Sequence, residues 1–153
     1  MKKILSISLY GDVKYLNKIL KNLNLFLNIF HDFEFYFYVD NKFNGILEKS
    51  IPLNNVKIFY RNQLSHSDGM FWRFEPIING IGDLCLVRDA DYLPTTFERN
   101  LINKFIDSKF NFHILRTHNR HRMPILGGLF GIKKKSYSIF KNGYYKWKKS
   151  HLF

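Results

Sequence analysis

The sequence predicts an α/β fold: one domain in which helices cover a largely parallel sheet. Apolar and β-branched runs of strand length alternate along the chain with segments of helical periodicity. The chain has 153 residues, 46% of them hydrophobic, which suffices for one domain with a real core. No internal repeat, long linker or low-complexity block divides it. We therefore expect a single domain over residues 1–153.

The first half of the chain predicts three strands and one helix. Residues 4–10 form a buried-looking strand that ends at Gly11, where the backbone can turn or approach a ligand closely. Residues 33–40, "FEFYFYVD", are aromatic and β-branched and end on Asp40, and residues 56–60 give a third, shorter strand. Between the first two strands, apolar residues recur at helical spacing and predict an amphipathic helix: Leu16, Leu20, Leu23, Leu27 and Phe30.

The second half predicts two helices and three further strands. Residues 70–80 resemble a helix that closes at Gly80, although Pro76 suits only a first turn. Residues 84–91, "LCLVRDAD", form the fourth strand. Thr95 and Glu98 then have the spacing of a capping box, which starts a helix through residue 106. Residues 112–116 and 127–133 are expected to be strands with a polar loop between them.

The formal net charge is +12, which invites a nucleic-acid partner. Lys, Asn, Ile and Phe are all abundant, however, as an AT-biased coding sequence would produce, and the chain has no recognition motif for nucleic acid. We favour the compositional explanation for most of the charge and expect no nucleic-acid partner. The remaining positive charge suits a pocket for a diphosphate.

The single cysteine, Cys85, excludes an internal disulfide and is expected to be a small core residue. The N-terminal apolar run lacks a cleavage site, and no segment approaches membrane-spanning length. We therefore expect a cytoplasmic protein. The basic aromatic tail, residues 144–149, leaves two interpretations: peripheral contact with the cytoplasmic membrane face, or the first turn of a helix, which we favour.

The acid pair Asp89 and Asp91 directly follows the fourth predicted strand. Ligands of such sheets bind beyond the carboxyl ends of the strands, where Gly11 and Asp40 also fall. Two carboxylates this close repel each other unless a cation lies beside them. Oxygen ligands suit Mg²⁺ or Mn²⁺, which complete their shells with substrate phosphates. A solvated turn would show the same D-x-D pattern, but its position after an apolar strand favours a metal site.

The chain resembles the GT-A-fold (Rossmann-like) glycosyltransferases that use nucleotide-sugar donors. More narrowly, it is similar to small sugar-transferase domains of bacteria, phages and large viruses. The segments "SLYG", "YVD", "MFWRFEPI", "VRDAD", "FHILRTH" and "ILGGLFG" show this resemblance in order, over residues 4–132. It implies a nucleotide-binding part over about residues 1–92 and an acceptor-side part over about residues 93–153. Relatives carry an acid in place of Thr117 and continue past this chain's end, so we expect the acceptor side to be truncated.

The resemblance also implies site residues. Asp91 would hold the metal, and Asp89 would contact the donor ribose or the metal through water. Donor-binding roles are implied for Leu9, Tyr10, Gly11, Asp40, Arg73, Gly127 and Gly128. Each has a structural alternative: a turn acid for Asp40, a surface arginine for Arg73, a bulge for the glycine pair.

No catalytic base is evident, and the candidates for a catalytic role are Arg116 and His118. Arg116 could instead pair with the acids. The resemblance implies a divalent-metal-dependent enzyme that moves a sugar from a nucleoside diphosphate sugar, with UDP or GDP as the nucleotide, to a glycan or other hydroxyl acceptor. The alternative is a weakly active or inactive remnant that still binds nucleotide sugar or serves as an interaction domain.

Overall fold

The computed structural model describes residues 1–50, 53–65, 67–116 and 125–150, and is built on a six-stranded sheet. The strand order is β3-β2-β1-β4-β6-β5. β1 to β4 pair in parallel, whereas β6 runs antiparallel to both β4 and β5. The predicted α/β class with a mostly parallel sheet is confirmed. The strands are β1 (Lys3–Leu9), β2 (Glu34–Asp40), β3 (Val56–Arg61), β4 (Leu84–Arg88), β5 (Phe112–Ile114) and β6 (Leu129–Lys133).

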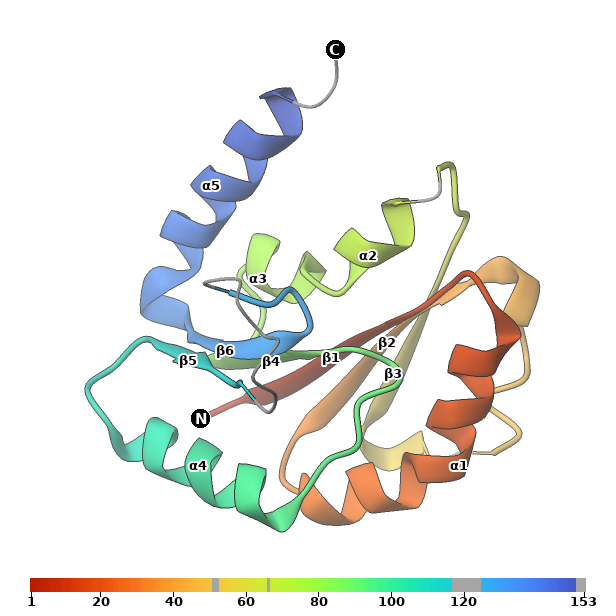
Figure 1. Ribbon diagram of the computed structural model, residues 1–153, viewed down its shortest axis with the longest axis horizontal. Coiled ribbons are helices and arrows are strands. Elements are labelled where there is room, and N and C mark those ends of the chain that lie inside the picture. The colour runs from red at the N-terminus through yellow and green to blue at the C-terminus, as the bar shows by residue number, and fades with distance from the viewer. Residues whose placement is uncertain (51–52, 66, 117–124, 151–153) are drawn as a thin grey trace.

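Helices cover both faces of the sheet (Figure 1). On one face lie α1 (Val13–Ile29) and α4 (Thr96–Asp107). On the other lie α2 (Asp68–Trp72), α3 (Glu75–Ile78) and α5 (Tyr137–Ser150). Asp12 caps α1 by accepting a hydrogen bond from the Lys14 amide at 2.8 Å. Half of the predicted capping box of α4 is present: Thr95 accepts from the Glu98 amide at 3.1 Å, whereas the Glu98 carboxylate accepts from Arg88 and Tyr92.

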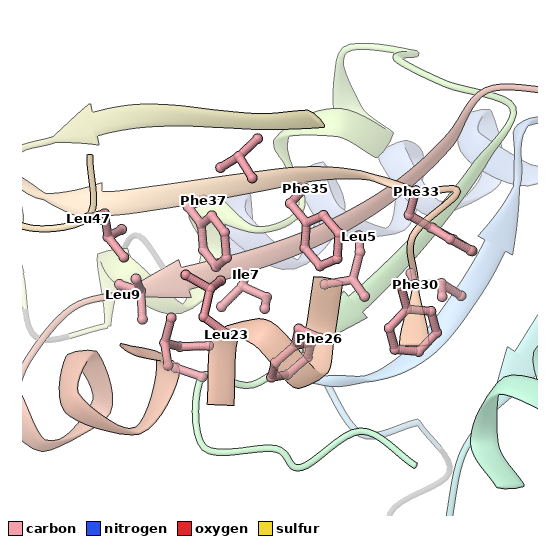
Figure 2. Packing of buried hydrophobic residues seen from close by; sticks show 14 of the residues in the cluster. Leu5, Ile7, Leu9, Leu23, Phe26, Phe30, Phe33, Phe35, Phe37 and Leu47 are labelled. Carbon is pink, nitrogen blue, oxygen red and sulfur yellow. The ribbon is translucent and has the colours of Figure 1, made fainter. Parts of the chain in front are cut away.

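Two hydrophobic cores result from the alternation of side chains along the strands. Leu5, Ile7 and Leu9 of β1 point toward α1, where Phe26 and its neighbours meet them (Figure 2). Ile4, on the opposite face of β1, packs with the residues of β4, β6 and α2 instead. Cys85 is fully buried in that second core, as expected of a small core residue, and burial raises the pKa of its thiol.

The single helix expected over residues 70–80 is wrong. The structure has two short helices, α2 and α3, separated by Arg73 and Phe74. Pro76 explains the break, because it has no amide hydrogen to donate to Trp72 and its ring would clash with that carbonyl. It lies instead in the first turn of α3, where proline is tolerated. The break places Arg73 at a corner between the two helices.

Several other boundaries differ from the expectations, and β5 ends at Ile114 rather than at residue 116. β4 ends at Arg88, so both acids lie in the following loop, and β6 begins at Leu129, so Gly127 and Gly128 lie in a turn before it. The favoured interpretation of the basic tail as the first turn of a helix is wrong, because residues 144–149 lie in the later turns of α5, which begins at Tyr137. Among the residues that the structure describes, no helix has the length and apolar character needed to cross a membrane.

A fully buried ion pair ties the end of β4 to the start of α4. Arg88 and Glu98 are 0% and 1% exposed, and Arg88 donates through Nε to Glu98 Oε1 at 2.8 Å. Arg88 also donates to the Phe130 carbonyl of β6 at 2.9 Å. Tyr92, in the intervening loop, donates to Glu98 Oε2 at 2.6 Å. The loop that contains Asp89 and Asp91 is therefore fixed at both ends.

We predict that Glu98→Ala lowers the free energy of unfolding by about 3–5 kcal/mol, because it leaves the Arg88 charge buried without a partner. Replacing both partners, Arg88→Met with Glu98→Leu, should cost much less than the sum of the single changes. Lys2→Ala, which breaks an exposed pair with Glu34, should cost at most about 1 kcal/mol. Chemical denaturation measures all three. If the loss of unfolding free energy in the double variant equalled the sum of the losses in the single variants Arg88→Met and Glu98→Leu, this explanation of the pair would be contradicted.

Because His113 of β5 has a lowered pKa in the folded chain, we predict that the stability of the fold depends on pH. Burial, together with the nearby charge of Arg88, lowers the pKa of His113 to about 4, and its Nδ1 has no hydrogen-bond partner in the described part of the chain. Between about pH 6.5 and pH 4 the unfolded chain binds a proton that the folded chain does not, so stability falls as the pH falls through this window.

The His113→Phe variant keeps a ring against Phe105, which lies 5.4 Å away between ring centroids. We expect its thermal unfolding midpoint to fall less between pH 7 and pH 5 than that of the wild type. Parallel pH profiles for the two proteins would show that His113 does not contribute.

Candidate functional site

A cavity opens where the direction of the sheet connections reverses. From β1 the chain passes to β2 and β3 on one side, and then returns to β4 on the other. The carboxyl ends of β1 and β4 are therefore neighbours at the position where α/β sheets bind ligands. The cavity there measures about 440 Å³. It is lined by Ser8, Tyr10, Gly11, Asp12, Lys14, Tyr15, Arg73, Asp89, Ala90 and Asp91.

Arg73 and Asp89 form an ion pair in the wall of this cavity. The Arg73 side chain is mostly buried, whereas the Asp89 side chain is 46% exposed. The Arg73 backbone amide donates to the Ser8 hydroxyl at 2.9 Å, which anchors the corner between α2 and α3 to β1. Arg73 Nε is buried and has no hydrogen-bond partner among the described residues. The guanidinium thus places a positive charge, paired with Asp89, in the wall of the cavity.

The glycine pair makes room for this ion pair. A Cβ atom on Gly128 would overlap the Asp89 carboxyl group, and one on Gly127 would lie 3.3 Å from Nη2 of Arg73. Both glycines lie in the turn before β6. Any larger residue at position 128 would displace Asp89, so the turn holds the acid by contact with bare backbone.

Asp91 is the more available of the two acids. Its side chain is 45% exposed, and its nearest ionic partner is Lys18 of α1, with 3.7 Å between Nζ and Oδ2. In the described ranges no cluster of three or more His, Cys, Asp or Glu side chains forms a complete metal site. Two carboxylates, one of them already paired with arginine, fit an ion that takes its remaining ligands from phosphate and water.

Tyr10 forms the aromatic side of the cavity. Its ring packs edge-on against Trp72, with 6.1 Å between centroids. A Cβ atom on Gly69 of α2 would overlap the Tyr10 ring, so this glycine permits the ring to lie flat on the helix. Burial raises the pKa of Tyr10 above its ordinary value.

The other predicted donor residues lie nearby in different roles. Gly11 has φ of 74°, a conformation that glycine adopts freely, and lines the cavity. Lys42 donates to the Gly11 carbonyl at 2.5 Å and lies 3.5 Å from Asp40. Asp40 caps the short turn Asn41–Phe43 and does not line the cavity, and Leu9 is fully buried in the core below β1.

A second, larger cavity of about 1100 Å³ adjoins the first, and Asp91 lines both. Its wall combines the start of α4 with β5 and is mainly apolar, with Leu93, Phe97 and Ile114 exposed around it. Arg116, the candidate catalytic residue, also lines this cavity. His118, the other candidate, lies outside the described residues.

The sequence interpretation missed Asp12, Lys14 and Tyr15, which line the cavity, and four residues that make its supporting contacts: Ser8, Lys18, Lys42 and Gly69. Lys18 had a usable signal, because it follows Tyr15 at the helical spacing i, i+3 and so shares its face of α1. Ser8, Lys42 and Gly69 serve backbone and ring contacts between segments far apart in the chain, which periodicity does not reveal.

Comparisons with known proteins agree with this fold. No family model matches the chain, and no curated protein matches its sequence significantly. A mannosyltransferase from Pyrobaculum calidifontis, solved with GDP-mannose and Mn²⁺, superposes with a TM-score of 0.65 at 12% identity over 91% of this chain and 46% of that one. A glycosyltransferase involved in glycosylation of the major capsid of PBCV-1 gives 0.54 at 17% identity, over 92% and 63%.

A nucleotidyltransferase-type enzyme has a similar fold. The 4-diphosphocytidyl-2C-methyl-D-erythritol synthase from Anaerococcus prevotii gives a TM-score of 0.57 at 14% identity, over 100% of this chain and 78% of that one. The chain therefore spans about half to two-thirds of the length of the two glycosyltransferases and nearly four-fifths of the synthase. The chain therefore has a GT-A-like, Rossmann-related fold.

Proposed function

We propose that the chain is a glycosyltransferase domain that takes a sugar from a nucleoside diphosphate sugar with the help of Mn²⁺ or Mg²⁺. The observation that supports this most is the placement of Asp89, Asp91 and Arg73 around one cavity at the carboxyl ends of β1 and β4. That position suits a nucleotide, and the residues suit its diphosphate. The fold is also that of two sugar transferases.

On the donor side, we assign the smaller cavity to the nucleotide and its diphosphate. Arg73 supplies a mostly buried positive charge, and Lys14 adds a second cation in the same wall. Tyr10 and Tyr15 offer ring surfaces to a base or ribose. α1 begins at Val13 beside the cavity, so its first free amides favour a negative group there.

Asp91 would bind the divalent ion, and Asp89, held by Arg73, would act on the donor ribose or on a water of the ion. An ion bound there would stabilise the diphosphate leaving group as a Lewis acid. Lys18, which faces Asp91 from α1, would then be released toward the phosphates. The protein's own contribution is to keep the donor oriented and the leaving group neutralised.

On the acceptor side, we assign the larger cavity between α4 and β5. It meets the donor cavity at Asp91, so an acceptor hydroxyl there would lie near the sugar being moved. Arg116 would bind acceptor or phosphate oxygens from the far wall. Transfer requires this cavity to hold the acceptor within reacting distance and to exclude water.

The alternatives are a remnant that binds nucleotide sugar without transferring it, and a nucleotidyltransferase, which the full coverage of this chain by the synthase favours. A thermal-shift screen separates them by ligand: nucleoside diphosphates, their sugars and nucleoside triphosphates, each with and without Mn²⁺. An increase in the unfolding midpoint caused by one nucleoside diphosphate sugar, and made larger by Mn²⁺, supports sugar transfer. Labelled donor with a panel of sugar acceptors then distinguishes transfer from mere binding. A response to CTP or UTP alone would contradict the proposal.

We predict that Asp91→Asn abolishes Mn²⁺-dependent donor binding and leaves the unfolding midpoint within a few degrees of the wild type, because the side chain is half exposed. Asp107→Asn, an acid exposed at the end of α4, is the matched control and should bind donor normally. Titration calorimetry at saturating Mn²⁺ measures this. Equal donor affinities for wild type and Asp91→Asn would rule out the metal role.

We also predict that Gly128→Ala weakens donor binding by about tenfold or more, because the new methyl group displaces Asp89 and with it Arg73, and one charge-assisted contact contributes about 1.5–3 kcal/mol. Gly143→Ala in α5 is the matched control, since a Cβ there meets nothing within 4 Å. The same calorimetric titration compares the two. Donor affinity unchanged by Gly128→Ala would show that the acid does not need its present position.

A further inference from the structure

The positive charge of the chain is concentrated in its last third. All the acidic residues lie at or before Asp107, whereas 11 of the 24 Lys and Arg residues follow it. Residues 108–153 therefore account for +11 of the formal net charge of +12. A compositional bias would distribute lysine without excluding acids from one segment. The asymmetry therefore needs an explanation beyond composition.

Much of this charge lies on α5. The helix carries Lys141, Lys146, Lys148 and Lys149, all exposed, and it contains no acid. In Figure 1 the helix extends away from the sheet, and its last turns lie beyond the other elements. Lys134 and Lys135, exposed just before its first turn, add to the same end of the molecule.

Exposed apolar side chains lie beside these lysines. Ile139 and Trp147 are 66% and 43% exposed and, with Gly143 between them, follow the spacing i, i+4, i+8 along one face of α5. Tyr145, 43% exposed, lies among the lysines on the polar side. The helix therefore has an apolar edge next to a basic face, which is the pattern of helices that lie in a membrane interface.

An apolar groove continues the apolar edge of the helix. It measures about 410 Å³, and its lining is almost wholly apolar. Phe71 of α2 packs against Trp147 in its wall, with 4.8 Å between ring centroids. Gly127, at the edge of the groove, belongs to the turn that also supports Arg73. The surface thus combines clustered cations with a hydrophobic recess.

We propose that α5 binds the surface of an anionic lipid bilayer, with Ile139 and Trp147 in the interface and the lysines on the headgroups. Charge complementarity identifies the occupant: an acid-free basic helix attracts anionic headgroups. Its exposed apolar edge and groove favour lipid over nucleic acid, whose backbone would contact the lysines but leave the apolar side chains in water. The proposal does not depend on the sugar-transfer function.

The test uses the full chain and vesicles of phosphatidylcholine with and without 30% phosphatidylserine, about the anionic content that gives a strong surface potential. Co-sedimentation should occur with the anionic vesicles and weaken with added salt. Trp147 supplies a second readout: the chain has two tryptophans, and Trp72 is only 9% exposed, so a blue shift in emission on vesicle binding reports Trp147. Trp147→Phe should lose the shift.

Two charge-matched triple variants complete the test. Changing Lys146, Lys148 and Lys149 to Gln should weaken vesicle binding about 10- to 100-fold. The control changes Lys21, Lys49 and Lys104, exposed elsewhere on the molecule, to Gln and should bind like the wild type. Equal losses in both variants, or no binding to anionic vesicles, would overturn the proposal.

Two further measurements identify another occupant. Oligonucleotides that bind more tightly than the vesicles, through the same lysines, would assign the surface to nucleic acid. Self-association abolished by the α5 triple variant, seen by analytical ultracentrifugation without lipid, would assign it to a second copy of the chain. Either result would also overturn the proposal.

Discussion

The buried pair of Arg88 and Glu98 is the constraint on which the site depends. β4 ends at Arg88 and α4 starts just before Glu98, so a single ion pair sets both ends of the loop that contains the acids. Removing two charges from water is costly, and an apolar pair could match it in stability. The pair instead fixes the positions of neighbouring segments. Arg88 also donates to the Phe130 carbonyl of β6, and Glu98 accepts from the Tyr92 hydroxyl of the loop, so both segments are held against the pair.

The loop between β4 and α4 in turn places its two acids in the walls of the cavities. Asp89 faces Arg73 in the smaller cavity, and Asp91 lines both that cavity and the larger one. The glycine turn before β6 closes the arrangement from the other side, because Gly128 leaves room for the Asp89 carboxyl. The two neighbouring acids therefore have different surroundings. Asp89 is held by Arg73, whereas the Asp91 side chain is 45% exposed and accessible to a ligand.

Much of the fold follows from sequence patterns, whereas most of the site's contacts do not. Apolar runs of strand length located β1, β2 and β4, and period-3.6 hydrophobicity located α1, because a central strand is buried on both faces and a covering helix on one. The same patterns misjudged residues 70–80, where the effect of Pro76 outweighed the apolar spacing. Strand ends indicated Asp89 and Asp91, but the contacts of Gly128 with Asp89 and of Lys42 with Gly11 join segments far apart in the chain. Such contacts become visible only once the chain is folded.

The proposed assignment of the smaller cavity to the nucleotide depends on where a nucleotide and its metal bind. The most direct measurement is a crystal structure of the chain grown with GDP or UDP and Mn²⁺, with anomalous scattering used to locate the manganese. We expect an anomalous peak within coordination distance of Asp91 and the diphosphate beside Arg73 at the start of α1. A nucleotide bound elsewhere, or manganese that contacts neither Asp89 nor Asp91, would contradict the assignment of this cavity as the donor site.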